Sequence, residues 1–218
     1  LDVHEFSEEV LPTKDQVIEF YEDIQELYEF RRSKFKKLRY VDFNQGVDAR
    51  LLNEEKMKLL STIPIRPLRI AFDSMKYAKS YENALRLAAK YKINHLSNYL
   101  LYNFEDEPID LYRRMRLNID LSEELGLQIY SFPMRYSPIW DENNLHHSRD
   151  FIGKHWNKKF IRSIQTILNA TKGKVGTRVS FFNASFGKNE DEYIELLYMP
   201  EAYILQRHKF ESNGLTEA

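Results

Sequence analysis

Apolar, strand-like runs alternate with helical patterns along the middle of this chain. The apolar runs span residues 38–43, 67–73, 96–102 and 127–132, and helical patterns follow the first three at about 53–60, 78–91 and 108–125. Strands that alternate with helices pair in parallel through right-handed crossovers. The sequence therefore predicts an α/β fold with a parallel sheet, built as four units of a doubly wound sheet or of a partial (β/α) barrel. A complete eight-unit barrel would need about 250 residues.

The pattern changes after the fourth run, where Pro133 and Pro138 interrupt regular structure and residues 140–149 are polar. Apolar spacings beyond this point predict a long helix over 151–168 and a shorter one over 191–198. We therefore expect a partial TIM-like barrel at residues 1–139, followed by a helical C-terminal extension at residues 140–218. The spacing of apolar residues over 14–31 predicts one more amphipathic helix, before the first strand.

Composition excludes several kinds of site and partner. The 218 residues contain no cysteine, so this chain alone provides no disulfide, no thiolate nucleophile and no thiolate ligands for zinc or an iron–sulfur cluster. The net charge of -1 gives no reason to expect nucleic acid or an anionic membrane as partner. No apolar run reaches the roughly 18 residues that a membrane span needs, so we expect a cytoplasmic protein without a membrane partner.

Polar side chains gather where each expected strand ends. Because the carboxyl ends of parallel strands meet at one edge of a sheet, these side chains are expected to line one rim. Amides and carboxylates suit the hydroxyl and amino groups of a polar ligand, and an arginine can bind a carboxylate or phosphate through two parallel hydrogen bonds. The candidates are Asn44, Gln45, Asp48 and Arg50 after the first run, Asp73 after the second, Asn103, Glu105, Asp106 and Glu107 after the third, and Arg135 and Tyr136 after the fourth. Any one of them alone is equally well explained as a turn residue or a helix cap.

Familiar catalytic motifs are absent from the sequence. It has no glycine-rich phosphate loop followed by Lys and Ser or Thr, no HExxH and no GxSxG. The adjacent His146 and His147 lie in a polar stretch and are expected to be solvated rather than to bind metal. No catalytic residue and no metal ligand set is predicted, although the rim carboxylates leave open a site for a hard cation.

Three segments closely resemble the later strands of radical S-adenosylmethionine proteins. They read DFNQGVDARLL over residues 42–52, PLRIAFD over 67–73 and LLYNFEDEP over 100–108, and the run RDFIGKHWN over 149–157 is similar to a bacterial or phage branch of the family. The resemblance covers about residues 38–205. It implies that residues 101–107 help to hold the adenine of S-adenosylmethionine, and that residues 44–48 lie near its ribose and methionine. The cofactor-binding residues so implied are Asn44, Gln45, Asp48, Arg50, Asp73, Asn103, Glu105 and Glu107, and Arg135 and Tyr136 are assigned to an unknown substrate.

The chain departs from this family in one respect. Radical chemistry there depends on a CxxxCxxC loop that binds a 4Fe-4S cluster, and this chain has no cysteine. The resemblance therefore implies the C-terminal portion of a radical S-adenosylmethionine enzyme, with the cluster loop upstream in a longer parent protein. The chain alone is expected to be inactive.

Two other functions remain open. One is a nucleic-acid-binding module, because basic and aromatic side chains that suit phosphates and stacked bases alternate near the C-terminal end. The residues concerned are Arg149, Lys154, Lys158, Lys159, Arg162, Lys172, Lys174 and Arg178, together with His155, Trp156 and Phe160. The other is a metal-dependent lyase or hydrolase that uses the carboxylates of the rim.

Overall fold

A computed structural model describes residues 39–138 and 150–213, together with the isolated positions 19 and 22. The chain divides into two compact units, residues 1–39 and residues 40–218. In the first unit Glu19 and Glu22 are helical, and the rest of the helix predicted over 14–31 lies outside the described residues. The fold described below is that of the second unit.

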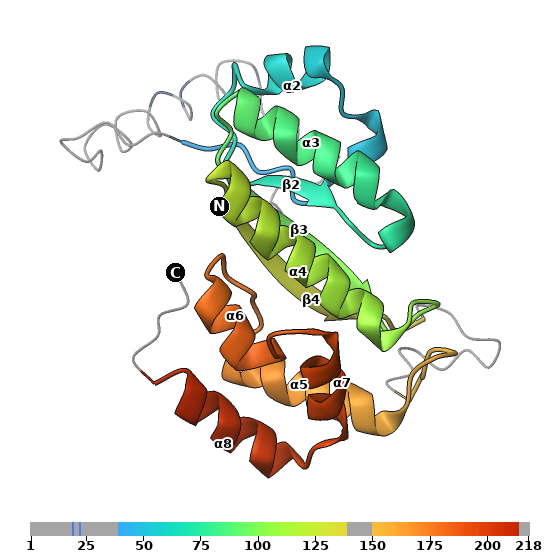
Figure 1. The fold of residues 1–218 in the computed structure, drawn as a ribbon. Coiled ribbons are helices and arrows are strands. Elements are labelled where there is room, and N and C mark those ends of the chain that lie inside the picture. Colours follow the sequence, from blue (N-terminus) through green and yellow to red (C-terminus); the bar gives the residue numbers. More distant parts are fainter. Residues whose placement is uncertain (1–18, 20–21, 23–38, 139–149, 214–218) are drawn as a thin grey trace. The chain divides into compact units, whose positions relative to one another are not determined.

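The second unit is an α/β structure around a four-stranded parallel sheet (Figure 1). The strands are β1 (Val47–Asp48), β2 (Leu68–Ala71), β3 (His95–Tyr102) and β4 (Gln128–Arg135), and they lie in the order of the sequence. Each strand pairs in parallel with the next, with Leu68 opposite Leu96 and Leu96 opposite Ile129. The α/β class and the parallel sheet predicted from the sequence are therefore confirmed.

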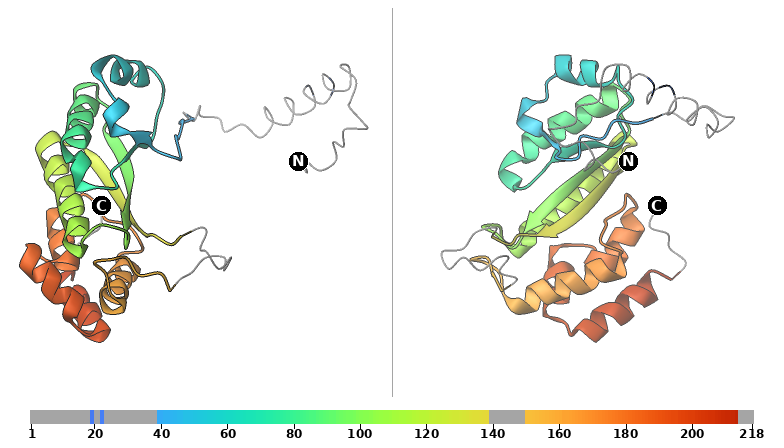
Figure 2. Two further views of the ribbon diagram at one scale, coloured as in Figure 1. Left: turned by 90° about the vertical axis from the view of Figure 1, so that its right-hand side faces the viewer. Right: turned by 180° about the vertical axis from the view of Figure 1, so that it is seen from behind.

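Helices α3 (Ala78–Lys90) and α4 (Pro108–Leu125) cover one face of this sheet, and the two views of Figure 2 agree on this arrangement. Alternate residues of β3, including Leu96, Leu100 and Tyr102, are buried toward these helices. Tyr99, on the opposite face, is 36% exposed. In the part of the chain that the structure describes, no helix covers this second face.

Local signals fix the ends of the helices beside the sheet. The side chain of Asn53 accepts a hydrogen bond from the Lys56 N–H and so caps α2 (Glu54–Leu60), as the sequence predicted. Pro108 begins α4, and Gly126 ends it with φ at 65°, a left-handed conformation that glycine adopts without steric cost. The predicted helices over 53–60, 78–91 and 108–125 are confirmed to within a residue or two.

Four more helices follow: α5 (Lys158–Ala170), α6 (Val179–Phe186), α7 (Glu190–Tyr198) and α8 (Glu201–Glu211). Helix α5 packs against α7 and α8, whereas α4 contacts both α6 and α7. Their apolar side chains, Ile164 and Leu197 among them, belong to the same core cluster as those of the sheet. The boundary predicted at 139/140 falls outside the described residues. Over residues 39–138 and 150–213, no helix combines the length and the apolar character that a membrane crossing requires.

The first strand differs from the prediction over 38–43. Leu38 lies outside the described residues, and Val41 forms an isolated bridge to Ile65 rather than a strand. The Gly46 N–H donates to the Phe43 carbonyl at 2.8 Å, and Gly46 has φ at 78°, so a tight turn interrupts the extended run. Pairing resumes after the turn, and the carboxyl end of this strand is Asp48.

The fourth strand continues through Pro133 to Arg135, beyond its predicted end at Phe132. Strand β4 lies at the edge of the sheet, and Ser131 uses both its N–H and its C=O to pair with Val175 on the outer side. Pro133, two residues on, faces the same outer side, so its missing N–H removes no bond to β3. The bridge to Val175 has no counterpart in the predictions.

The C-terminal helices were predicted incompletely. Helix α5 begins at Lys158 and not near residue 151, because Asn157 caps it by accepting from the Phe160 N–H at 2.8 Å. The helix predicted over 191–198 is confirmed as α7. Helices α6 and α8 were not predicted.

Candidate functional site

A cavity of about 630 Å³ opens at the carboxyl ends of β2 and β3. The residues that line it come from the loop after β2, from the end of β3 and the loop after it, and from α4. They are Asp73, Ser74, Met75, Lys76, Tyr77, Leu101, Phe104, Glu105, Asp106, Asp110 and Arg114. Four carboxylates face two cations on this lining, so the cavity is acidic.

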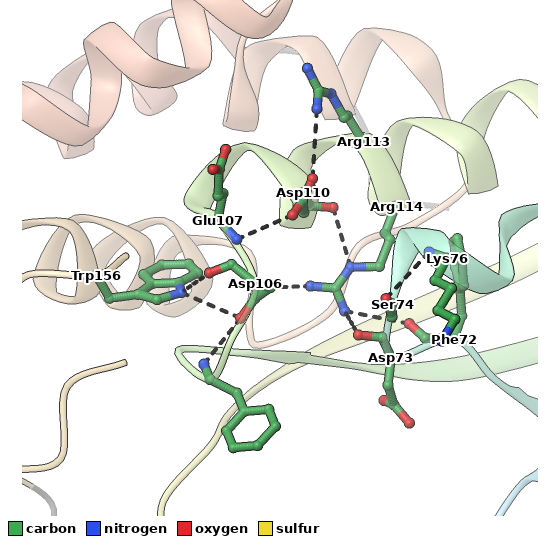
Figure 3. A network of polar contacts seen from close by, with 11 residues as sticks. Phe72, Asp73, Ser74, Lys76, Asp106, Glu107, Asp110, Arg113, Arg114 and Trp156 are labelled. Atoms are coloured by element: carbon green, nitrogen blue, oxygen red, sulfur yellow. Dashed lines mark hydrogen bonds and ion pairs between the residues drawn. The ribbon is translucent and has the colours of Figure 1, made fainter. Parts of the chain in front are cut away.

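Arg114 joins the three elements beneath the cavity (Figure 3). Its side chain is fully buried, and its guanidinium donates to the carbonyl oxygens of Asp73 at 3.0 Å and Phe72 at 3.4 Å. It also donates to the Asp110 carbonyl at 3.2 Å and to Asp106 Oδ2 at 3.0 Å. Burial lowers the pKa of Arg114, and the neighbouring carboxylates oppose that effect. A guanidinium nevertheless stays charged in proteins, so Arg114 fixes the loop after β2 to the loop after β3.

Asp106 receives hydrogen bonds from three sides (Figure 3). Besides Arg114, the Phe104 N–H donates to its Oδ1 at 3.0 Å, and Trp156 Nε1 donates to its Oδ1 at 3.3 Å and to its carbonyl at 2.8 Å. Burial raises the pKa of the Asp106 carboxyl, and the donors and the charge of Arg114 partly offset the rise. The contacts of the Asp106 carboxylate are therefore mainly with other groups of the protein.

The amino end of α4 lies beside the same cavity. The Glu107 N–H donates to Asp110 Oδ2 at 3.1 Å, and the Glu107 side chain accepts from the N–H of Asp110, which forms a reciprocal capping box. Glu107, one of the implied cofactor ligands, therefore caps a helix. It is exposed but does not line the cavity.

Two of the implied cofactor-binding residues, Asp73 and Glu105, come together on the cavity lining, and both are exposed. Arg50 lies close by, because its guanidinium is 4.6 Å from the centre of the Tyr77 ring, which also lines the cavity. The Arg50 guanidinium donates to both carboxylate oxygens of Asp48 and lowers the pKa of that carboxyl. These four residues form one polar rim along the ends of β1, β2 and β3.

Asn44 and Gln45 lie in the turn that precedes β1, where both are exposed. They therefore do not follow the carboxyl end of a strand. Their assignment to ribose and methionine remains a prediction.

Asn103 is buried and links three segments. Its Nδ2 donates to the carbonyls of Tyr136 and Phe151 at 3.2 Å each, and its Oδ1 accepts from the Gly153 N–H at 2.9 Å. It has φ at 69°, a left-handed conformation that asparagine tolerates better than most residues. Both amide hydrogens thus already have acceptors, and Asn103 holds residues 151–153 against the end of β3.

Neither Arg135 nor Tyr136 is among the described residues that line the acidic cavity. Arg135 donates to the Phe151 carbonyl at 2.9 Å and lines two other cavities, on the side of β4 that faces α5. The Tyr136 ring contacts the rings of Phe104 and Phe151. The structure therefore separates Arg135 from the residues that line the acidic cavity, whereas Tyr136 contacts one of them, Phe104.

The structure also describes part of the residues considered for a metal-dependent enzyme and for a nucleic-acid-binding module. Over the described part of the chain, no group of three or more His, Asp or Glu side chains converges as a metal site would require. His146 and His147 lie outside the described residues. Trp156 and Phe160 are 6% and 8% exposed, so their rings pack in the core, whereas Lys158 and Arg162 are exposed.

Five polar residues of the site, Asp110 among them, were not among the sequence-based candidates. Ser74, Lys76 and Tyr77 lie in the loop after β2, one turn beyond Asp73. Arg114 could have been found, because it lies three and four residues from Leu111 and Asn118, both buried, and so falls on the inner face of a helix. A lone arginine on such a face indicates a buried charge that needs partners.

Comparisons of this chain with protein-family models, with curated proteins and with solved structures give no match.

Proposed function

We propose that the acidic cavity binds a small polar ligand that carries positive charge, with S-adenosylmethionine as the candidate. The observation that carries the proposal is the lining itself. The carboxylates of Asp73 and Glu105 are exposed there, above a floor that Arg114 and Asp106 hold in place. Pockets for small ligands commonly have volumes of about 300–1,000 Å³, and this cavity falls within that range.

The arrangement of the sheet supports a partial barrel as its framework. The strand order β1-β2-β3-β4 follows the sequence, and α3 and α4 lie on the same face. A doubly wound sheet would reverse direction and place helices on both faces, whereas a (β/α) barrel keeps them on the outside. The acidic cavity then lies at the rim of the carboxyl ends, where barrels bind their ligands.

The residues present fit S-adenosylmethionine in part. Asp73 and Glu105 would hold its amino and hydroxyl groups, and Lys76 would attract its carboxylate. Bound beside an iron–sulfur cluster, this cofactor supplies radical chemistry. The residues do not fit the cluster, because the chain has no cysteine, so its thiolate ligands would have to come from outside these 218 residues. We therefore infer that the chain contributes the cofactor-side wall of a radical S-adenosylmethionine enzyme.

Calorimetric titration of the chain with S-adenosylmethionine and with S-adenosylhomocysteine tests the proposal. The two ligands differ by a methyl group and one positive charge, so an acidic cavity should bind the sulfonium compound about tenfold more tightly. Asp73→Asn and Glu105→Gln should each weaken its binding by a similar factor.

The control is Glu123→Gln, which removes an exposed carboxylate from α4 outside the cavity lining and should leave the affinity unchanged. The proposal is overturned if neither ligand shows saturable binding. It is also overturned if all three variants bind like the unmodified chain.

A further inference from the structure

Helix α5 presents a polar stripe on its exposed side. Lys158, Arg162, Gln165 and Asn169 follow one another at spacings of four, three and four residues, and Lys172 comes three residues later, just past the helix end. Such spacings place side chains on one face of a helix. All five residues are exposed, whereas Ile161, Ile164 and Leu168 on the other side lie in the core.

Two cavities lie along this stripe and share Arg135. The larger, of about 430 Å³, is lined by Arg135 and Lys172 together with Gln165 and Asn169. The smaller, of about 180 Å³, is lined by Arg135, Lys158, Arg162 and Asp150, with Ile152 and Ile161. The two cavities and the residues that line them are called the α5 cleft below.

The described residues of the α5 cleft carry an excess of positive charge. Four of them have cationic side chains, and one, Asp150, has a carboxylate. Among the described residues Lys158 and Arg162 form no ion pair, and Gln165 Nε2 donates to Asn169 Oδ1 at 2.9 Å, which orders the amides between the cations. Clefts lined by one sign of charge raise the local concentration of the opposite charge.

We propose that the α5 cleft binds a small anionic ligand that carries a phosphate or diphosphate group. Arginine and lysine are the side chains that bind phosphate oxygens, and the amide N–H groups of Gln165 and Asn169 add neutral donors between them. Among the described residues, none lines both the α5 cleft and the acidic cavity. The chain would thus bind an anion on one side of β4 and a cationic ligand at the ends of β2 and β3.

The dimensions and the aromatic residues favour a small molecule over nucleic acid. Proteins that bind single strands stack successive bases on exposed aromatic rings along a groove. Here Tyr102, which lines the larger cavity, is 1% exposed, and Trp156 and Phe160, at the amino end of α5, are buried as well. The two cavities are local hollows of a few hundred cubic ångströms, which suits one phosphorylated group.

Calorimetric titration of the whole chain with inorganic pyrophosphate, at low ionic strength, tests this proposal. Saturable binding is expected. Lys158→Gln and Arg162→Gln should each weaken binding about tenfold, because each removes a charged donor, and the double variant should weaken it further. Both side chains are exposed, so the variants should melt at the same temperature as the unmodified chain.

Lys79→Gln is the matched control, since it removes an exposed lysine from α3, away from the α5 cleft. The proposal fails if pyrophosphate shows no saturable binding, or if Lys79→Gln weakens binding as much as Arg162→Gln. It also fails if a single-stranded RNA oligonucleotide binds through Lys158 and Arg162 and pyrophosphate does not displace it, which would assign the α5 cleft to nucleic acid.

Discussion

The acidic cavity and the α5 cleft hold their arginines in opposite ways. Arg114 beneath the cavity is fully buried, and its guanidinium donates to three carbonyls and one carboxylate of the chain itself. Arg162 in the α5 cleft is exposed on the outer face of a helix. A buried guanidinium persists only where the protein supplies its partners. Arg114 is therefore part of the framework, whereas Arg162 faces a space that a ligand can enter.

The carboxylates of the acidic cavity show the same division within one site. Asp106 accepts from Arg114, Phe104 and Trp156 and is largely removed from solvent. Asp73 contributes its carbonyl to the framework and leaves its side chain exposed on the lining. Asp106 and Asp73 both follow the ends of strands, yet one supports a loop and the other is exposed on the lining. The position of a charged residue at a strand end therefore does not by itself say whether the residue binds a ligand.

The largest effect is expected when Arg114, the buried arginine, is replaced by methionine. Arg114→Met leaves the buried Asp106 carboxylate without its cation and removes donors from three carbonyls. Breaking a buried ion pair in this way costs about 3–5 kcal/mol. We expect a loss of that size in the free energy of unfolding, measured by urea denaturation.

The neighbouring Arg113 provides the control for this prediction. Its guanidinium pairs with Glu190 at 2.9 Å, but the side chain is 45% exposed, and exposed pairs contribute less than about 1 kcal/mol. Equal losses for Arg113→Met and Arg114→Met would contradict the framework role of Arg114. If Arg114→Met does not fold, the double variant with Asp106→Asn should recover folding, because it removes the unpaired carboxylate.

A second variant tests residues 151–153, which Asn103 holds against the end of β3 and of which Ile152 lines the α5 cleft. A Cβ added at Gly153 would lie 2.8 Å from the Asn103 carbonyl carbon and 2.9 Å from its oxygen, and these are backbone atoms that cannot turn aside. We expect Gly153→Ala to lower the free energy of unfolding by about 2–3 kcal/mol. Phe151 and Ile152 should then leave their places beside Arg135, so pyrophosphate binding should weaken as well.

The variant Gly126→Ala measures the cost of a left-handed backbone alone, without the steric clash that an added Cβ causes at Gly153. Gly126 has φ at 65° and nothing within 4 Å of an added Cβ, so its cost is only the left-handed backbone, about 1–2 kcal/mol. It should not affect pyrophosphate binding. A smaller loss for Gly153→Ala than for Gly126→Ala would refute the close packing of residue 153 against the end of β3.

Ionic strength should distinguish the two sites. The cations of the α5 cleft are exposed, and dissolved ions screen exposed charges beyond a Debye length of about 10 Å at 0.1 M. We expect pyrophosphate affinity to fall roughly tenfold between about 0.05 M and about 0.5 M sodium chloride. S-adenosylmethionine affinity should fall less, because that ligand carries one net positive charge whereas pyrophosphate carries several negative charges. Titrations at both salt concentrations measure this, and equal salt dependence at the two sites would remove the distinction.

The smallest effect concerns the exposed ion pairs at low pH. Arg69 lowers the pKa of Asp42, and Arg113 lowers the pKa of Glu190. A carboxyl whose pKa is lower in the folded state stabilises the fold above its unfolded pKa, near 4, and loses that contribution as the pH falls through its folded pKa. The melting temperature should therefore fall between about pH 5 and about pH 3.

Glu190→Gln should make this decline slightly less steep, by an amount that exposure and screening keep small. Asp106 acts in the opposite direction, because burial raises its pKa and favours its protonated form. A melting temperature that rises throughout this acid range would show that the buried Asp106, and not the exposed pairs, dominates the titration.

The sequence was sufficient for the repeated elements of the sheet. Apolar runs, Asn53 as a cap, Pro108 at the start of α4 and Gly126 at its end are local signals, so three helices and most of three strands could be predicted. The first strand was misplaced because the turn at Gly46 shifts pairing to Val47, and pairing depends on the neighbouring strand. The start of helix α5 was predicted too early because Phe151, which is partly buried, and Trp156, which is buried in the core, are apolar but not helical.

The candidate site was predictable in outline and not in its assignment of roles. Because polar residues follow parallel strands, the sequence alone predicts that Asp73 and Glu105 lie at one rim. Only the tertiary structure decided that Glu107 caps α4, that Asn103 binds backbone atoms of Tyr136, Phe151 and Gly153, and that Arg135 faces α5. The physical reason is that local spacing determines which face of a strand or helix a residue occupies, whereas the partners of a polar group come from segments far away in the chain.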